Sequence, residues 1–236
     1  MDFDSALARC LTSGISAEDR VYVDFHAARF REIIAIVLRQ SQPGAAVANV
    51  GLSCFDLIAT EVMSDRRYVS LVPSEAFAAR FPAALYARIP RLAYDVTRDE
   101  APPDQRFDVV ILADVLEHLF CEDEPVIDRL KRTMAPDGAA VLSFPNAMRH
   151  VNRLKAVLGR NIFPGKTDIV HGVFGGFGHI REYSIGEVRK LLEPRFRQVA
   201  VTGLNAYGTP AQRRAMRLLP SSMRSTILAV ARGPRG

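Results

Sequence analysis

The segment Phe107–Leu119, FDVVILADVLEHL, carries the strongest fold signal in the chain. Its apolar run, Val109–Leu112, is typical of a parallel strand that is buried on both faces. Three side chains that can exchange protons or bind metals follow at once: Asp114, Glu117 and His118. Because open α/β sheets bind ligands beyond the carboxyl ends of their strands, these three residues are the first candidates for a functional site.

The same three residues also have a purely structural interpretation. Asp114 is a good helix cap, and Glu117 and His118 would then form a solvated pair in the first turn. If a helical turn begins at Val115, Asp114 and Glu117 are three positions apart and share a face. Both interpretations place the residues just after a buried strand.

Helix and strand candidates alternate on both sides of this segment. Before it, the pattern predicts helices at 16–40, 55–63 and 74–81 and strands at 45–50, 68–72 and 92–96. After it, the pattern predicts helices at 123–134, 151–158 and 184–193 and strands at 139–144, 198–202 and 226–231. This alternation indicates a doubly wound, mainly parallel sheet in a single α/β domain. We expect a helical segment at 1–44, the α/β domain at 45–236, and a glycine-rich substrate loop at 160–180.

The composition fits one globular domain. The chain has 236 residues, of which 48% are hydrophobic, and no apolar run approaches the roughly 18 residues that a membrane span needs. The first residues, MDFDSALARC, contain acids where a signal peptide would be basic, which predicts a cytoplasmic protein. The three cysteines (Cys10, Cys54 and Cys121) are too widely spaced for a metal pair, so buried thiols are expected.

The net charge of +5 is unevenly distributed. Residues 194–236 contain eight arginines and no lysine or acid, so this segment is +8 and residues 1–193 sum to −3. Such a segment can bind nucleic acid or an anionic membrane surface, or it can be a solvated basic helix. Few aromatic residues lie among these arginines, which disfavours a platform for single-stranded nucleic acid. We expect an exposed, non-catalytic helix face at Arg213, Arg214 and Arg217.

The middle of the chain resembles the class I S-adenosylmethionine-dependent methyltransferases. The matching features are FDVVILADVLEHL, the helix-like Asp123–Met134, and the turn and strand APDGAAVLSFPN at 135–146. The resemblance extends from about Ala46 to Arg232 and is weaker at its start. It implies a Rossmann-like transferase fold with seven strands, of which the last is antiparallel.

The glycine motif departs from that family. Its members carry an acid, an apolar residue and three alternating glycines, which let the backbone approach the cofactor. Here the segment reads NVGLSCF at 49–55: Gly51 matches the first glycine, Ser53 and Phe55 replace the other two, and Asn49 replaces the acid. The second strand ends in Val72 without the acid that holds the ribose in the family.

The resemblance nevertheless implies S-adenosylmethionine as the cofactor. Asp95 matches the family position beside the adenine amino group, although an aspartate that begins a turn is an equal alternative. The cofactor-binding residues implied by the resemblance are Asn49, Gly51, Ser53, Asp95, Val96 and Asp114. The missing glycines and acid predict weakened or rearranged binding, with complete loss of binding as the alternative.

A second resemblance concerns the chemistry. Ubiquinone-pathway O-methyltransferases and small-RNA 2′-O-methyltransferases hold a divalent metal with a Glu-x-x-Glu-His cluster, and the RNA enzymes add a later histidine. The corresponding residues here are Asp114, Glu117, His118 and His179. They are therefore candidate ligands of Mg²⁺ or Mn²⁺, which would lower the pKa of an acceptor hydroxyl. Without a metal, His118 or His179 would act as a general base, or His179 would only anchor its loop. The candidate catalytic residues are therefore His118, Glu117 and His179.

These observations predict a methyltransferase that acts on a hydroxyl of a sugar, glycolipid or natural-product intermediate. The segment 179–196 resembles methyltransferases found among polysaccharide-assembly enzymes. An RNA 2′-O-methyltransferase is the second hypothesis, supported by the basic segment but not by any RNA-binding module. The third is a methyltransferase-like protein that has lost its cofactor and its catalysis.

Overall fold

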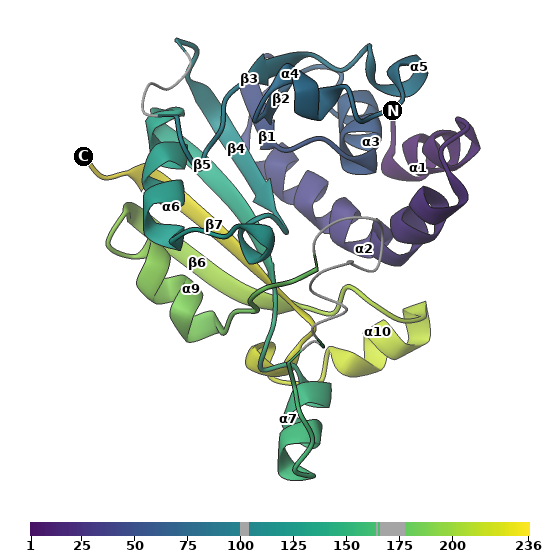
Figure 1. Ribbon diagram of the computed structural model, residues 1–236, viewed down its shortest axis with the longest axis vertical. Helices are drawn as coiled ribbons and strands as arrows, with labels where there is room; N and C mark the ends of the chain where they lie inside the picture. The colour runs from purple at the N-terminus through teal and green to yellow at the C-terminus, as the bar shows by residue number, and fades with distance from the viewer. Residues whose placement is uncertain (100–103, 164, 166–177) are drawn as a thin grey trace.

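The computed structural model describes residues 1–99, 104–163, 165 and 178–236. A seven-stranded sheet with the order β3-β2-β1-β4-β5-β7-β6 forms its centre (Figure 1). The strands are β1 (Ala46–Val50), β2 (Arg67–Val72), β3 (Arg91–Ala93), β4 (Phe107–Ala113), β5 (Met134–Pro145), β6 (Phe196–Leu204) and β7 (Thr226–Pro234). β1 to β5 pair in parallel, whereas β7 runs antiparallel to β5 and β6. The predicted α/β fold with an antiparallel last strand is therefore confirmed.

Helices cover both faces of the sheet. They are α1 (Phe3–Thr12), α2 (Ala17–Gln40), α3 (Cys54–Val62), α4 (Glu75–Ala78), α5 (Ala83–Tyr86), α6 (Asp123–Arg132), α7 (His150–Val157), α9 (Ile185–Leu192) and α10 (Pro210–Met216), with short 3-10 turns η1 (Leu116–His118) and η2 (Ser221–Met223). None of the helices in the described ranges is long and apolar enough to cross a membrane.

The apolar run of β4 is buried because the sheet has a core on each face. Val109 and Ile111 pack into the core under α2 and α3. Val110 and Leu112 point the other way, into the core under α6 and α9. This is the environment that a continuous apolar run in a parallel strand predicts.

Three local expectations need correction. The single helix expected at 74–81 is the short α4, and after a break at Pro82 the chain forms a second short helix, α5. The third strand ends at Ala93 instead of residue 96, because the chain turns at Asp95. Cys121 is exposed, whereas Cys10 and Cys54 are buried as expected. Most of the glycine-rich loop expected at 160–180 lies outside the described residues.

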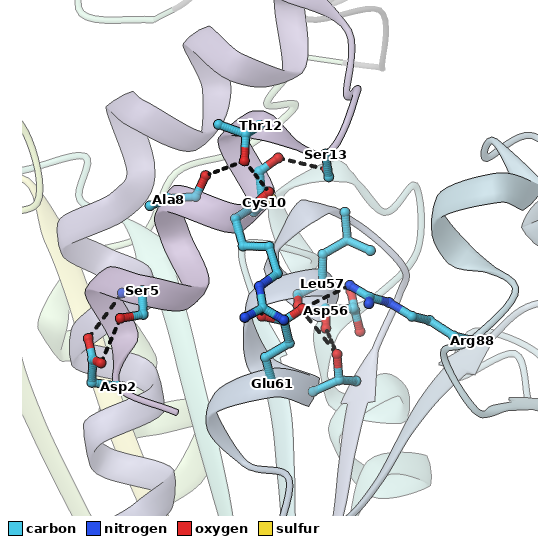
Figure 2. Close-up of polar contacts among 12 residues, drawn as sticks. Asp2, Ser5, Ala8, Cys10, Thr12, Ser13, Asp56, Leu57, Glu61 and Arg88 are labelled. Atoms are coloured by element: carbon cyan, nitrogen blue, oxygen red, sulfur yellow. Dashed lines mark hydrogen bonds and ion pairs between the residues drawn. The ribbon is translucent and has the colours of Figure 1, made fainter.

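The first helix is attached to α3 by polar as well as apolar contacts (Figure 2). Asp2 caps α1 by accepting hydrogen bonds from the backbone nitrogen of Ser5 at 3.0 Å and from its hydroxyl at 2.7 Å. Glu61 on α3 lies 3.6 Å from Nε of Arg9 on α1 and 3.0 Å from a guanidinium nitrogen of Arg88. The cap stabilises α1 itself, and the Arg9–Glu61 contact connects α1 to α3.

A buried carboxylate ties α3 to the first two strands. Oδ1 of Asp56 accepts hydrogen bonds from the amide of Asn49 at 3.0 Å, the hydroxyl of Tyr68 at 2.8 Å and the hydroxyl of Ser70 at 2.5 Å. Oδ2 accepts from the backbone nitrogen of Ser53 at 2.8 Å and completes a capping box. The turn between β1 and α3 is therefore held in one position by this side chain.

Replacing Asp56 with Ala should lower the free energy of unfolding by at least about 3 kcal/mol, because several buried donors lose their acceptor together. Urea denaturation followed by circular dichroism measures this loss. The matched control is Asp24→Ala, an exposed aspartate on α2, which should change stability by less than about 0.5 kcal/mol. Equal losses in both variants would contradict the role given to Asp56.

Candidate functional site

A cavity of about 460 Å³ lies at the carboxyl ends of β1, β2 and β4. The chain winds outward from β1 toward β3 in one direction and from β4 toward β5 in the other. The cavity therefore occupies the point where the winding reverses, which is where doubly wound sheets bind ligands. All six predicted cofactor-binding residues line it: Asn49, Gly51, Ser53, Asp95, Val96 and Asp114.

The conformation of the turn after β1 requires a glycine at position 51. Gly51 has φ +103°, a region that side-chain-bearing residues rarely adopt, and a Cβ there would meet no atom within 4 Å. Phe55, which replaces the family's third glycine, is buried and packs edge-on against Phe30 of α2 at 5.3 Å between ring centroids. The bulky ring is therefore accommodated in the cavity wall.

Two of the lining side chains are already engaged in internal contacts. The amide nitrogen of Asn49 donates to Asp56, as described above. Oδ1 of Asp95 accepts hydrogen bonds from the backbone nitrogen of Thr97 at 2.8 Å and from its hydroxyl at 2.6 Å. Asp95 thus begins a turn, as the alternative interpretation predicted, while it also lines the cavity.

An ion pair between Arg29 and Asp114 links α2 to the turn after β4. Asp114 has φ +51°, in the left-handed region that aspartate enters more readily than most residues. Its Oδ1 accepts a hydrogen bond from the hydroxyl of Ser143 at 2.5 Å, and its Oδ2 pairs with the guanidinium of Arg29. Arg29 also lies 3.4 Å from the hydroxyl of Tyr22.

Arg29 was not predicted as a site residue. Its side chain is only 2% exposed, and its buried Nε has no hydrogen-bond partner among the residues that the structure describes. The available signal was its position, because Arg29 lies on the helical stripe that Ile33 and Val37 share. A charged residue on a buried stripe needs a partner, and only the tertiary structure shows that the partner is Asp114.

Glu117, His118 and His179 converge beside the cavity. Each offers one nitrogen or oxygen atom, and these three atoms lie within 4.8 Å of one another. A backbone hydrogen bond holds the segment of His179 next to Glu117, since the backbone nitrogen of Ile180 donates to the carbonyl of Glu117 at 2.9 Å. Asp114, predicted as a fourth ligand, is not in this group because Arg29 and Ser143 hold its carboxylate.

The two carboxyl groups beside His179 have opposite electrostatic environments. Nε2 of His179 lies 3.9 Å from Glu117, and Nδ1 lies 3.7 Å from Glu182. Burial raises the pKa of Glu117 to about 8; the charge of Glu182 adds to this effect, and the charge of Arg29 only partly opposes it. Burial also raises the pKa of Glu182, but hydrogen bonding to His179 and the charge of Arg149 outweigh it and lower the pKa overall. At neutral pH, Glu117 is therefore protonated and Glu182 ionised.

The basic C-terminal segment does not form one continuous charged surface. Arg195 pairs with Asp128 at 3.2 Å and Arg197 with Asp137 at 2.6 Å. Other arginines bond to neutral groups of the body: Arg224 to carbonyl oxygens, Arg232 to Gln40 and Arg235 to the carbonyl of Phe196. Near α10, Arg214 and Arg217 are exposed and Arg213 is half-buried.

Comparisons with known proteins identify the fold. No family model and no curated protein matches the sequence. The N-methyltransferase NodS from Bradyrhizobium japonicum WM9, solved with S-adenosyl-L-homocysteine, covers 100% of both chains with TM-score 0.55 and 15% identity. Magnesium protoporphyrin IX methyltransferase from Synechocystis PCC 6803, solved with the same ligand, matches 97% of this chain and 94% of its own with TM-score 0.55 and 19% identity.

A possible histamine N-methyltransferase from Thermotoga maritima matches 90% of this chain and 92% of its own, with TM-score 0.58 and 12% identity. All three are similar to this chain along nearly their whole length. The chain therefore has the fold of the class I S-adenosylmethionine-dependent methyltransferases, as its sequence resemblance implied.

The buried carboxyl of Glu117 predicts a pH-dependent stability. The native state keeps a proton up to about pH 8 that the unfolded chain releases near its ordinary pKa of 4.5. The unfolded state thus binds fewer protons between these values, and stability falls there by about 1.4 kcal/mol per pH unit as pH rises.

Urea denaturation at several pH values, with a chelator present, tests this expectation. Glu117→Gln should remove the decrease between pH 5 and about pH 8. Glu182→Gln is the matched control and should keep the decrease, because the lowered pKa of Glu182 makes its own contribution change only at lower pH. The upper end of the decrease should move to lower pH in this variant, since the charge of Glu182 helps to raise the pKa of Glu117. A decrease that persists in Glu117→Gln would show that another group causes it.

Proposed function

We propose that this chain is an S-adenosylmethionine-dependent methyltransferase that methylates a hydroxyl group of a sugar, glycolipid or natural-product intermediate. One observation carries the proposal: a single cavity at the switch point joins the glycine turn after β1 to His118 after β4. The site for the methyl donor and a side chain that can accept a proton therefore line the same cavity. Proteins of this fold are described as N- or C-methyltransferases, and some were solved with S-adenosylhomocysteine.

The lining residues fit most parts of the cofactor. Arg29 lines the cavity with a buried Nε that lacks a partner among the described residues, so it can donate to the methionyl carboxylate. Gly51 lets the backbone approach the ligand. The apolar side chains of Leu71, Phe77 and Val96 suit the adenine ring. The ribose of the cofactor fits less well, because β2 ends in Val72, is followed by Pro73, and offers no carboxylate to the ribose hydroxyls.

The cofactor, when bound, supplies a methyl group on a positively charged sulfur. The residues of this chain have to bring an acceptor hydroxyl to that group and remove its proton. His118 lines the cavity and is assigned as the general base. His179 lies with its ring centroid 5.0 Å from that of His118. The ionised Glu182 holds Nδ1 of His179, which leaves Nε2 directed toward the cluster.

A divalent cation is the second candidate for activating the acceptor. The ligand atoms of Glu117, His118 and His179 are close enough together to share one ion. Two imidazoles and one carboxylate suit Mn²⁺, Fe²⁺ or Zn²⁺ better than Mg²⁺. Binding would require Glu117 to release its proton, so the metal affinity would rise with pH. Its carboxylate oxygens accept no hydrogen bond from the described residues, and an ion would satisfy them.

RNA is a less supported acceptor. The basic C-terminal segment favoured it, but most of those arginines are bonded to neighbouring groups of the body. The role in polysaccharide assembly rests on sequence resemblance alone. Loss of cofactor binding has less support than binding, because the cavity retains the required turn at Gly51 and adds the cation Arg29.

Isothermal titration calorimetry with S-adenosylhomocysteine tests the cofactor assignment. We expect binding to the wild-type chain, and much weaker binding of 5′-methylthioadenosine, which lacks the amino-acid carboxylate. Losing one charged hydrogen bond costs about 1.5–3 kcal/mol, or roughly 10- to 150-fold in affinity. Arg29→Met should reduce the preference for S-adenosylhomocysteine by roughly that factor, and Arg29→Lys should keep part of it.

The matched control is Arg31→Met, an exposed arginine two positions away on the same helix. It should bind both ligands as the wild type does. No heat and no thermal shift with millimolar S-adenosylhomocysteine would reject the enzyme and support the non-catalytic hypothesis. Binding without any preference in the wild type would reject only the role of Arg29.

Substitutions in the cluster distinguish a general base from a metal site. His118→Ala should lower turnover by roughly 10²- to 10⁴-fold if the histidine is the base, with no effect of a chelator. If a metal is bound, Glu117→Ala should remove it and abolish turnover, and a chelator should inactivate the wild type reversibly. Cofactor affinity should change little in either variant. Metal content by mass spectrometry decides between these outcomes, and full activity of His118→Ala without metal would exclude both.

A further inference from the structure

Helix α7 exposes an apolar face instead of burying one. Leu154 is 61% exposed, Leu158 60% and Val157 85%. Val151, Leu154 and Leu158 follow the spacing of one helical stripe. In Figure 1, α7 projects from the body of the molecule. Such a stripe is normally turned toward a core, and an exposed one marks a candidate interaction surface.

The opposite face attaches α7 to the body. Asn152 is the buried residue of the helix, and its amide donates to the carbonyl of Ala147 at 2.9 Å. Arg149 pairs with Glu182 at 3.1 Å, and Arg153 donates to the hydroxyl of Ser222 at 3.1 Å. The outward direction of the apolar face is therefore fixed by polar contacts on the other side.

Cations border the apolar face of α7. Lys155 and Arg160 are exposed on α7 and just after it. Arg214, Arg217 and the 90% exposed Leu218 add the same combination near the end of α10. The sequence contains no acid between Asp137 and Asp168 and none after Glu193. Both elements thus combine exposed apolar side chains with basic side chains that form no ion pair among the residues that the structure describes.

A groove joins these two elements. It has a volume of about 680 Å³ and is lined by His150 and Val151 on the α7 side and by Ala215, Met216 and Leu219 on the α10 side. α7 follows β5, so it lies at the carboxyl edge of the parallel strands, where the cavity is also found. The apolar face, the cations and the groove therefore belong to one end of the molecule.

We propose that α7 and the end of α10 form a docking surface for an anionic lipid bilayer. Leu154, Val157, Leu158 and Leu218 would enter the headgroup region, and Lys155, Arg160, Arg214 and Arg217 would contact lipid phosphates. Interfacial helices have this arrangement of a bulky apolar face flanked by lysine and arginine. The positive charge favours a bilayer over a neutral partner protein, since anionic lipids attract basic side chains close to the surface. The inference does not depend on methyl transfer.

Sedimentation with vesicles tests the docking surface on the full chain without cofactor. We expect binding to phosphatidylcholine vesicles that contain roughly one-third phosphatidylglycerol, weak binding to phosphatidylcholine alone, and a decrease as salt is raised. The double variant Lys155→Gln/Arg160→Gln should lower the partition coefficient about 25-fold, because each basic residue contributes about fivefold. Leu154→Ser/Val157→Ser should also lower it at least about tenfold.

Two control variants carry single changes of the same kinds elsewhere on the surface. Val21→Ser removes an exposed apolar side chain of α2, and Lys190→Gln removes an exposed cation of α9. Both should bind vesicles as the wild type does, and thermal melts should show that all variants are folded. Binding that is absent, independent of lipid charge, or unchanged in either double variant would overturn the proposal. A dimer in sedimentation velocity that Leu154→Ser/Val157→Ser dissociates would instead assign the surface to a second copy of the chain.

Discussion

The buried ion pair between Arg29 and Asp114 is the interaction on which the candidate site depends. Taking two charges out of water is costly, and each charge is tolerated because the other is present. The hydroxyl of Ser143 donates a further hydrogen bond to the carboxylate of Asp114. The pair brings α2 to the carboxyl edge of the sheet, where that helix supplies a wall of the cavity. Removing either partner alone would leave an uncompensated charge in the site.

The departures from the family's glycine motif become intelligible once α2 is in place. Of the three positions that are glycine in the family's motif, only the first, Gly51, adopts a conformation here that demands glycine. Ser53 instead serves as the cap of α3, and its backbone bonds to Asp56. Phe55 finds an aromatic partner in Phe30 on α2. The turn is thus stabilised by a capping box and a ring contact, while the approach to the cavity past Gly51 stays open.

The chemistry of the cluster arises from unequal environments of similar groups. Glu117 and Glu182 both flank His179, yet one is held neutral by burial and the other is ionised beside Arg149. A neutral acid, an ionised acid and two imidazoles can hold a proton in several places. The same arrangement becomes a ligand set if a cation displaces the proton of Glu117. Burial and the nearest charge therefore decide which chemistry is available.

Local sequence patterns determined the strand and helix order and the parallel sheet, and they indicated a candidate site after β4, because apolar periodicity and caps act over a few residues. They also indicated that Glu117, His118 and His179 belong together. The partner of Asp114, the role of Asp56 and the outward face of α7 depended on tertiary structure. Arg29 and Asp114 are 85 positions apart, and the pKa of Glu117 follows from burial on all sides. Long-range pairing and burial exist only in the folded chain, so local periodicity in the sequence cannot predict them.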